Sequence, residues 1–115
     1  MELHGCLERH PGFGEALGAL QSHRPASFDG VVGSSCALLV ASLWQHAPDS
    51  LLVVCPKQAD IDTFAGDLSL FTAQVPERFP AWEADRAERR IHDDIYADRL
   101  RTLKLLLDSS QRHLV

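Results

Sequence analysis

The spacing of apolar and polar residues predicts four helices. Apolar residues recur at helical spacing over residues 13–20 and 57–71, which predicts two amphipathic helices. Residues 37–44 are apolar almost throughout, which predicts a buried helix that begins near Ser34 or Ser35, since either hydroxyl can cap it. Near the end of the chain, two adjacent aspartates at a first turn predict a fourth helix. Its expected apolar stripe consists of Ile95, Leu100, Leu103 and Leu107.

Short apolar runs between these helices predict β-strands. Residues 50–56, SLLVVCP, form an uninterrupted apolar run ended by proline, which is typical of a parallel strand covered on both faces. Residues 28–32 predict a shorter buried strand, and residues 75–79 predict a weak one because proline interrupts them. Residues 112–115 resemble the start of a further strand. Alternating helices and strands predict an α/β fold, a parallel sheet with helices on both faces.

The length of 115 residues is sufficient for one domain with a real core. We therefore expect a single α/β module over residues 1–115. It would comprise a leading helix and connector at residues 1–27 and an αβ core at residues 28–115. Because the last residues look like the first part of a strand, we expect the chain to be a fragment of a larger multidomain protein.

Composition and charge narrow the possible functions. Hydrophobic residues make up 45% and charged residues 23% of the chain, as in ordinary globular proteins, which excludes disordered and collagen-like classes. Eleven basic and sixteen acidic residues give a net charge of −5, which disfavours binding to a nucleic-acid backbone. The sequence shows neither a signal peptide nor an apolar run long enough for a membrane span, so we expect a cytoplasmic protein.

The cysteines and histidines do not predict a metal site. Cys6, Cys36 and Cys55 are odd in number, are separated by 30 and 19 residues, and include no C-x-x-C pair. The six histidines are equally scattered. We expect reduced thiols and no bound metal.

One stretch, GVVGSSCALL at residues 30–39, has the outline of a phosphate-binding loop. A working loop reads G-x-x-x-x-G-K-[ST]. Aligned on that pattern, the second glycine, the lysine and the hydroxyl residue are replaced by serine, cysteine and alanine, so the groups that bind phosphate and magnesium are lost. We expect no ATP site here, although a weak anion site at the N–H groups of Ser34 and Ser35 stays open. The residues of this vestigial loop are Gly30, Gly33, Ser34, Ser35, Cys36 and Ala37.

A few other residues have a functional and a structural interpretation. Cys36 at a helix start could be a nucleophile, but a buried apolar cysteine is favoured. His92 and the two aspartates after it suggest acid/base or metal chemistry, but the charge preference of a helix start explains the aspartates. Trp44 is expected in the core, whereas Trp82 is equally suited to burial or to partner binding. The mixed charges of residues 83–90 favour a solvated loop.

The order of several segments carries a family resemblance. GVVGSSCALLVASL, LLVVCP, DLSLF, FPAWE and HDDIYADRLRTLKLL occur in succession, and together they resemble the N-terminal UvrB-like module of the bacterial transcription-repair coupling factor (Mfd). The resemblance runs over residues 17–115. It implies a partial RecA-like fold of the P-loop NTPase type, with a degenerate phosphate loop and no catalytic, cofactor-binding or metal-binding residues. UvrB itself is the nearest competitor, but its P-loop lysine and threonine correspond here to Cys36 and Ala37, and its tyrosine-rich hairpin is missing.

The resemblance also implies a function. This segment would be a non-catalytic structural and interaction module of a transcription-coupled nucleotide excision repair factor, packed against other domains of its parent. The parent would be an ATP-dependent DNA translocase that displaces stalled RNA polymerase and recruits UvrA. ATP, magnesium, DNA and those partners would bind outside this segment. Two alternatives stay open: a freestanding α/β enzyme that binds a phosphorylated ligand and uses Cys36 or His92, and a UvrB-type damage-binding protein.

Overall fold

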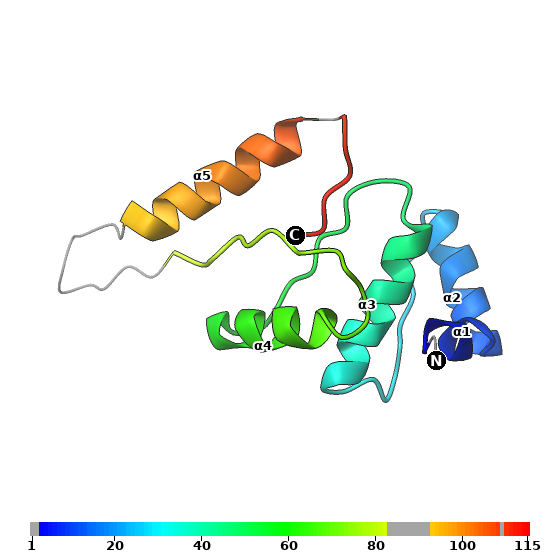
Figure 1. Ribbon diagram of the computed structural model, residues 1–115. Coiled ribbons are helices and arrows are strands. Elements are labelled where there is room, and N and C mark those ends of the chain that lie inside the picture. Colours follow the sequence, from blue (N-terminus) through cyan, green and yellow to red (C-terminus); the bar gives the residue numbers. More distant parts are fainter. Residues whose placement is uncertain (1–2, 83–92, 109) are drawn as a thin grey trace.

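The chain folds into helices joined by extended segments (Figure 1). The computed structural model describes residues 3–82, 93–108 and 110–115. In this part of the chain there are five α-helices and no β-strand. The helices are α1 (His4–Glu8), α2 (Pro11–Gln21), α3 (Ser34–His46), α4 (Gln58–Leu68) and α5 (Asp93–Leu107).

The predicted parallel sheet is wrong, and with it the α/β, RecA-like fold class. Among the described residues, the expected strands at residues 28–32, 50–56 and 75–79 are absent. A single isolated parallel bridge joins Leu51 to Leu114. The apolar run at residues 50–56 is covered on only one face, because Leu52 and Val54 are 66% and 82% exposed whereas their neighbours are partly buried. The apolar run at residues 50–56 is therefore not buried on both faces, although its sequence is continuously apolar.

The four predicted helices are confirmed as α2, α3, α4 and α5, whereas α1 was not predicted. Pro11 opens α2, and the ring Nδ1 of His10 accepts a hydrogen bond from the Gly12 N–H at 3.1 Å. Proline suits a first helical position because that N–H has no partner within the helix. The predicted serine cap of α3 is wrong: Gly33 is the cap residue, and no side chain caps this end.

The core lies where α3 and α4 meet the extended segments. Ala37 and Ala41 stand one turn apart on α3 and are fully buried, and their small side chains let α4 approach closely. Leu68, at the end of α4, is also fully buried. The buried cluster consists of Ala37, Ala41, Trp44, Leu68 and Leu114.

The N-terminal helices pack on the C-terminal end of α3. Phe13 of α2 is 4% exposed, and its ring centroid lies 6.2 Å from that of His46. The Nε2 of His46 also lies 3.0 Å from a carboxylate oxygen of Glu8 in α1. One histidine at the end of α3 therefore contacts both preceding helices.

Helix α5 stands apart from the other helices and is attached to residues 76–82 (Figure 1). The hydroxyl of Thr102, fully buried, donates to the Arg78 carbonyl at 2.6 Å, and the Arg99 guanidinium donates to the Pro80 carbonyl. These two polar contacts determine which face of the helix turns inward. The predicted apolar stripe is therefore wrong for three of its residues: Leu100, Leu103 and Leu107 are all exposed.

Candidate functional site

The glycine loop before α3 is held by two residues with left-handed backbone conformations. Gly30 has a φ of 76° and Gly33 a φ of 59°. Nothing lies within 4 Å of the position that a Cβ would take at either residue. The positive φ angles, and not a lack of space, are therefore the reason for glycine at both positions. The loop keeps the conformation of a tight turn into a helix.

The polar side chains of this loop bond to the loop's own backbone. The Ser35 hydroxyl accepts from the Val32 N–H at 3.0 Å and donates to the Val32 carbonyl. The Cys36 thiol donates to the Val31 carbonyl at 3.6 Å. The Ser35 N–H also donates to the Val32 carbonyl, at 3.3 Å, so one of the two N–H groups of the expected weak anion site is already used.

The structure places the vestigial loop residues together at the start of α3, where the printed bonds of the Ser35 and Cys36 side chains go to the backbone of Val31 and Val32. Cys36 is partly buried, and Ala37 is fully buried in the core. His92 lies outside the described residues, as does the charged stretch at residues 83–90. Trp44 is 8% exposed, which confirms its predicted core position, and Trp82 is 52% exposed.

The cysteines and the other possible metal ligands do not form a metal site in the part of the chain that the structure describes. All three cysteines are free, and Cys6 is exposed. Residues 3–82, 93–108 and 110–115 contain no group of three or more histidine, cysteine, aspartate or glutamate side chains placed to share a metal ion. None of the helices in these ranges combines the length and apolarity needed to cross a membrane.

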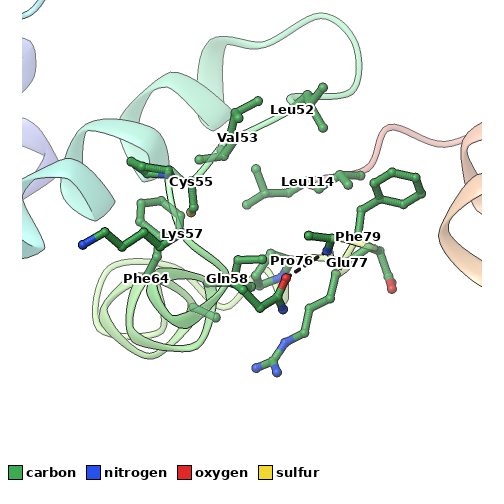
Figure 2. Close-up of a pocket in the computed structure, with 17 residues that line it drawn as sticks. Leu52, Val53, Cys55, Lys57, Gln58, Phe64, Pro76, Glu77, Phe79 and Leu114 are labelled. Carbon is green, nitrogen blue, oxygen red and sulfur yellow. Dashed lines mark hydrogen bonds between the residues drawn. The ribbon is translucent and has the colours of Figure 1, made fainter. Parts of the chain in front are cut away.

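A cavity of about 300 Å³, here called the slot, lies between residues 52–58 and residues 76–81 (Figure 2). Leu114 and Val115 line one end of the slot. Phe64 of α4 contributes an aromatic ring to its lining, and Figure 2 shows the Lys57 ammonium directed away from the cavity. The slot is therefore mainly apolar. Its walls come from segments about twenty residues apart, so no local pattern of residues indicates the slot.

A hydrogen bond joins the two walls of the slot. The side-chain carbonyl oxygen of Gln58 accepts from the Ala81 N–H at 2.9 Å (Figure 2). A side-chain amide thus satisfies a backbone donor that a neighbouring peptide carbonyl would satisfy in a sheet. This hydrogen bond links residues 58 and 81, which both line the slot.

The slot also contains a thiol with altered acidity. Burial raises the pKa of Cys55 above the ordinary thiol value of 9.0, and the nearby Asp60 carboxylate raises that pKa further. Both effects favour the neutral thiol over the thiolate. Because the thiolate is the nucleophile, Cys55 is poorly suited to covalent catalysis at neutral pH. Its position favours a packing role in the slot wall.

An aromatic and arginine cluster fixes the other side of residues 76–82. The Arg99 guanidinium carbon lies 3.9 Å from the centroid of the Phe79 ring and 4.9 Å from that of Trp82. The Tyr96 ring lies 6.1 Å from Trp82. Cation–π contacts of this kind attract a guanidinium to the ring faces. Sequence analysis missed the cluster, whose only local signal is the spacing of Tyr96 and Arg99 on one face of α5.

Comparison with known proteins gives no match. No protein-family description, curated protein or solved structure matches the chain.

Proposed function

We propose that this chain is a non-catalytic structural and interaction module. The observation that carries the proposal is the state of the glycine loop. Its hydroxyl and thiol bond to the backbone of Val31 and Val32, and its lysine position is occupied by Cys36. Binding of ATP phosphates requires a cation and a hydroxyl that coordinates magnesium, and this loop presents neither.

The extent of exposed surface supports the interaction part of the proposal. The chain exposes 8611 Å², whereas a compact monomer of 12.7 kDa exposes about 6,200 Å². Several large apolar side chains among the described residues are exposed, and large exposed apolar areas mark interaction sites. Among residues 3–82, 93–108 and 110–115, the six most exposed large apolar side chains, between 66% and 86% exposed, are Val32, Leu52, Val54, Leu70, Val75 and Leu107.

The repair assignment rests on the segment order that resembles the transcription-repair coupling factor. On this proposal the parent protein is a cytoplasmic, ATP-dependent DNA translocase that displaces stalled RNA polymerase and recruits UvrA. ATP and magnesium serve its downstream motor, and this segment supports neighbouring domains. The proposed function comes from the resemblance alone. The parallel sheet that the resemblance also implied is not proposed, because the structure contradicts it. The stretch PAWEADRAERRI at residues 80–91, which stands where UvrB has its tyrosine-rich hairpin, lies outside the described residues from residue 83 onward.

The first prediction concerns nucleotide binding. We expect titration of ATP and magnesium into the chain to give no binding heat in calorimetry, because the loop offers no cation or metal-coordinating hydroxyl. An unrelated protein with an intact P-loop, titrated in the same way, serves as the positive control. Tight, magnesium-dependent binding of ATP would contradict the non-catalytic assignment.

The second prediction concerns the repair assignment. In a bacterium that carries this chain, deleting the coding segment for residues 1–115 should abolish the faster repair of transcribed strands. Repair of the non-transcribed strand should stay unchanged, because general excision repair does not use the coupling factor. Strand-specific lesion counting after ultraviolet irradiation measures both rates. An undiminished strand bias would reject the repair assignment without affecting the prediction on ATP.

A further inference from the structure

Helix α5 carries an apolar stripe on its exposed side. The stripe consists of Tyr96, Leu100, Leu103 and Leu107, whose side chains are between 45% and 86% exposed. Successive members are four, three and four residues apart. At about 100° per residue, the four side chains fall within a sector of about 60°. Alternating steps of three and four residues form the seam along which one helix packs on another.

The chain attaches to a different side of this helix. Thr102 is fully buried and donates to the Arg78 carbonyl at 2.6 Å. Helical spacing places Thr102 about 130° round the helix from the middle of the stripe. A second helix can therefore pack on the stripe without displacing the contact between Thr102 and Arg78.

The charges along α5 are separated by sign. Residues 93–98 contain three aspartates and no basic residue, whereas residues 99–104 contain two arginines, one lysine and no acidic residue. Asp93 and Lys104 are both exposed and border the same side of the stripe. They lie about 16 Å apart along the axis, at about 1.5 Å per residue, so they cannot pair within one helix.

This arrangement of charge is complementary to its own copy in the antiparallel direction. In a two-fold pair of helices, the same side of each helix meets itself with the ends reversed. Asp93 of each copy would then lie beside Lys104 of the other. In that register Tyr96 of one copy also falls within one residue of the level of the second copy's Leu100, so charge pairing and apolar packing agree. A parallel pair would instead place like charges side by side.

We propose that the chain forms a two-fold dimer in which α5 packs antiparallel on α5 of a second copy. The apolar stripes would form the centre of the contact, and Asp93 and Lys104 would form one ion pair at each end. This inference goes beyond the proposed function, because it depends on α5 alone and not on a role in repair. A contact of one helix per copy is smaller than the interfaces of stable dimers, so the dimer would be weak and reversible.

Sedimentation equilibrium of the whole chain tests whether the dimer forms. We expect the apparent mass to rise with concentration from that of a monomer towards twice that value, with a Kd between about 10 µM and 1 mM. The measurement should extend to about 2 mM, so that a Kd at the upper end of this range is still detected.

An exchange of charges tests the antiparallel direction. Asp93→Lys and Lys104→Glu each place like charges at both ends of the pair, so each variant alone should dimerise about tenfold more weakly. An equimolar mixture of the two variants restores opposite charges at both ends, and its association should return to within about threefold of that of the natural chain. Circular dichroism of each variant checks that its helices are intact.

Two matched variants locate the contact. Leu100→Glu places a charge in the middle of the stripe and should weaken dimerisation at least about tenfold. Leu70→Glu makes the same change at an exposed position outside α5 and should leave dimerisation unchanged. If Asp93→Lys does not fold, this pair of variants still decides whether α5 forms the contact.

Three outcomes would overturn the proposal. A chain that stays monomeric up to about 2 mM would show that a second copy does not cover the stripe. Equal effects of Leu100→Glu and Leu70→Glu would show that the two copies do not meet through α5. The third outcome is a mixture of the charge variants that associates no better than either variant alone, which would show that the helices do not pair antiparallel.

Discussion

Replacing Leu68 with alanine is expected to lower the free energy of unfolding by about 2–5 kcal/mol. Leu68 is fully buried at the end of α4, in the cluster that joins α4 to α3 and to Leu114. The truncation removes apolar contacts and leaves a cavity, and the alanines opposite are too small to fill it. The total free energy of unfolding of a domain of this size is about 5–15 kcal/mol, so the loss is a large part of its stability.

The control for this prediction lies two residues further along the chain. Leu70 is 73% exposed, and Leu70→Ala should change the free energy of unfolding by no more than about 0.5 kcal/mol. Urea unfolding followed by circular dichroism measures both variants. Similar unfolding midpoints for the two would mean that α3 and α4 do not form the stabilising core.

The helices could be predicted from the sequence because helical periodicity is a local property. In α4, Ile61, Phe64 and Leu68 fall at helical spacing, and α4 forms as expected with Leu68 buried. In α5 the helix was predicted correctly but its inward face was not. That face is determined by Thr102 and Arg99, whose partners are carbonyls of residues more than fifteen positions away.

The prediction of a sheet failed because strand pairing is not local. An apolar run indicates that some surface is buried, but it does not indicate which segment pairs with which or over how many residues. Residues 51–53 and 113–115 do lie side by side, but one bridge is all that forms between them in the described chain. Without a ladder and without a helix over Leu52 and Val54, the run remains an extended segment with one open face.

The two candidate sites, the glycine loop and the slot, also differ in how far the sequence could predict them. The glycine loop was found in the sequence because a phosphate loop is a continuous stretch, and both Gly30 and Gly33 have positive φ angles, which favour glycine. The slot depends on two segments and on residues 113–115 between them, and no pattern within either segment indicates that arrangement. The thiol of Cys55 became informative only when its burial in the slot wall was known.

Arg112→Ala is expected to lower the free energy of unfolding by about 1–3 kcal/mol. The reason is that the Arg112 side chain both donates hydrogen bonds to carbonyls at the end of α3 and lies against the Trp44 ring. Its guanidinium donates to the Trp44 carbonyl at 2.9 Å and to the Ala47 carbonyl, and it lies 4.3 Å from the Trp44 ring centroid. The last carbonyls of a helix have no partner within the helix, and a positive charge is favourable there.

Two further substitutions separate the geometry of Arg112 from its charge. Arg112→Lys keeps the charge but loses the planar guanidinium that reaches two carbonyls and stacks on Trp44, so it should recover only part of the loss. Arg101→Ala removes an exposed arginine whose contact is a 3.6 Å pair with Asp98, and it should have almost no effect. Urea unfolding, with Trp44 fluorescence read in a Trp82→Phe background, measures all three. If the Arg112→Ala and Arg101→Ala variants have the same free energy of unfolding, the C-terminal segment does not stabilise α3.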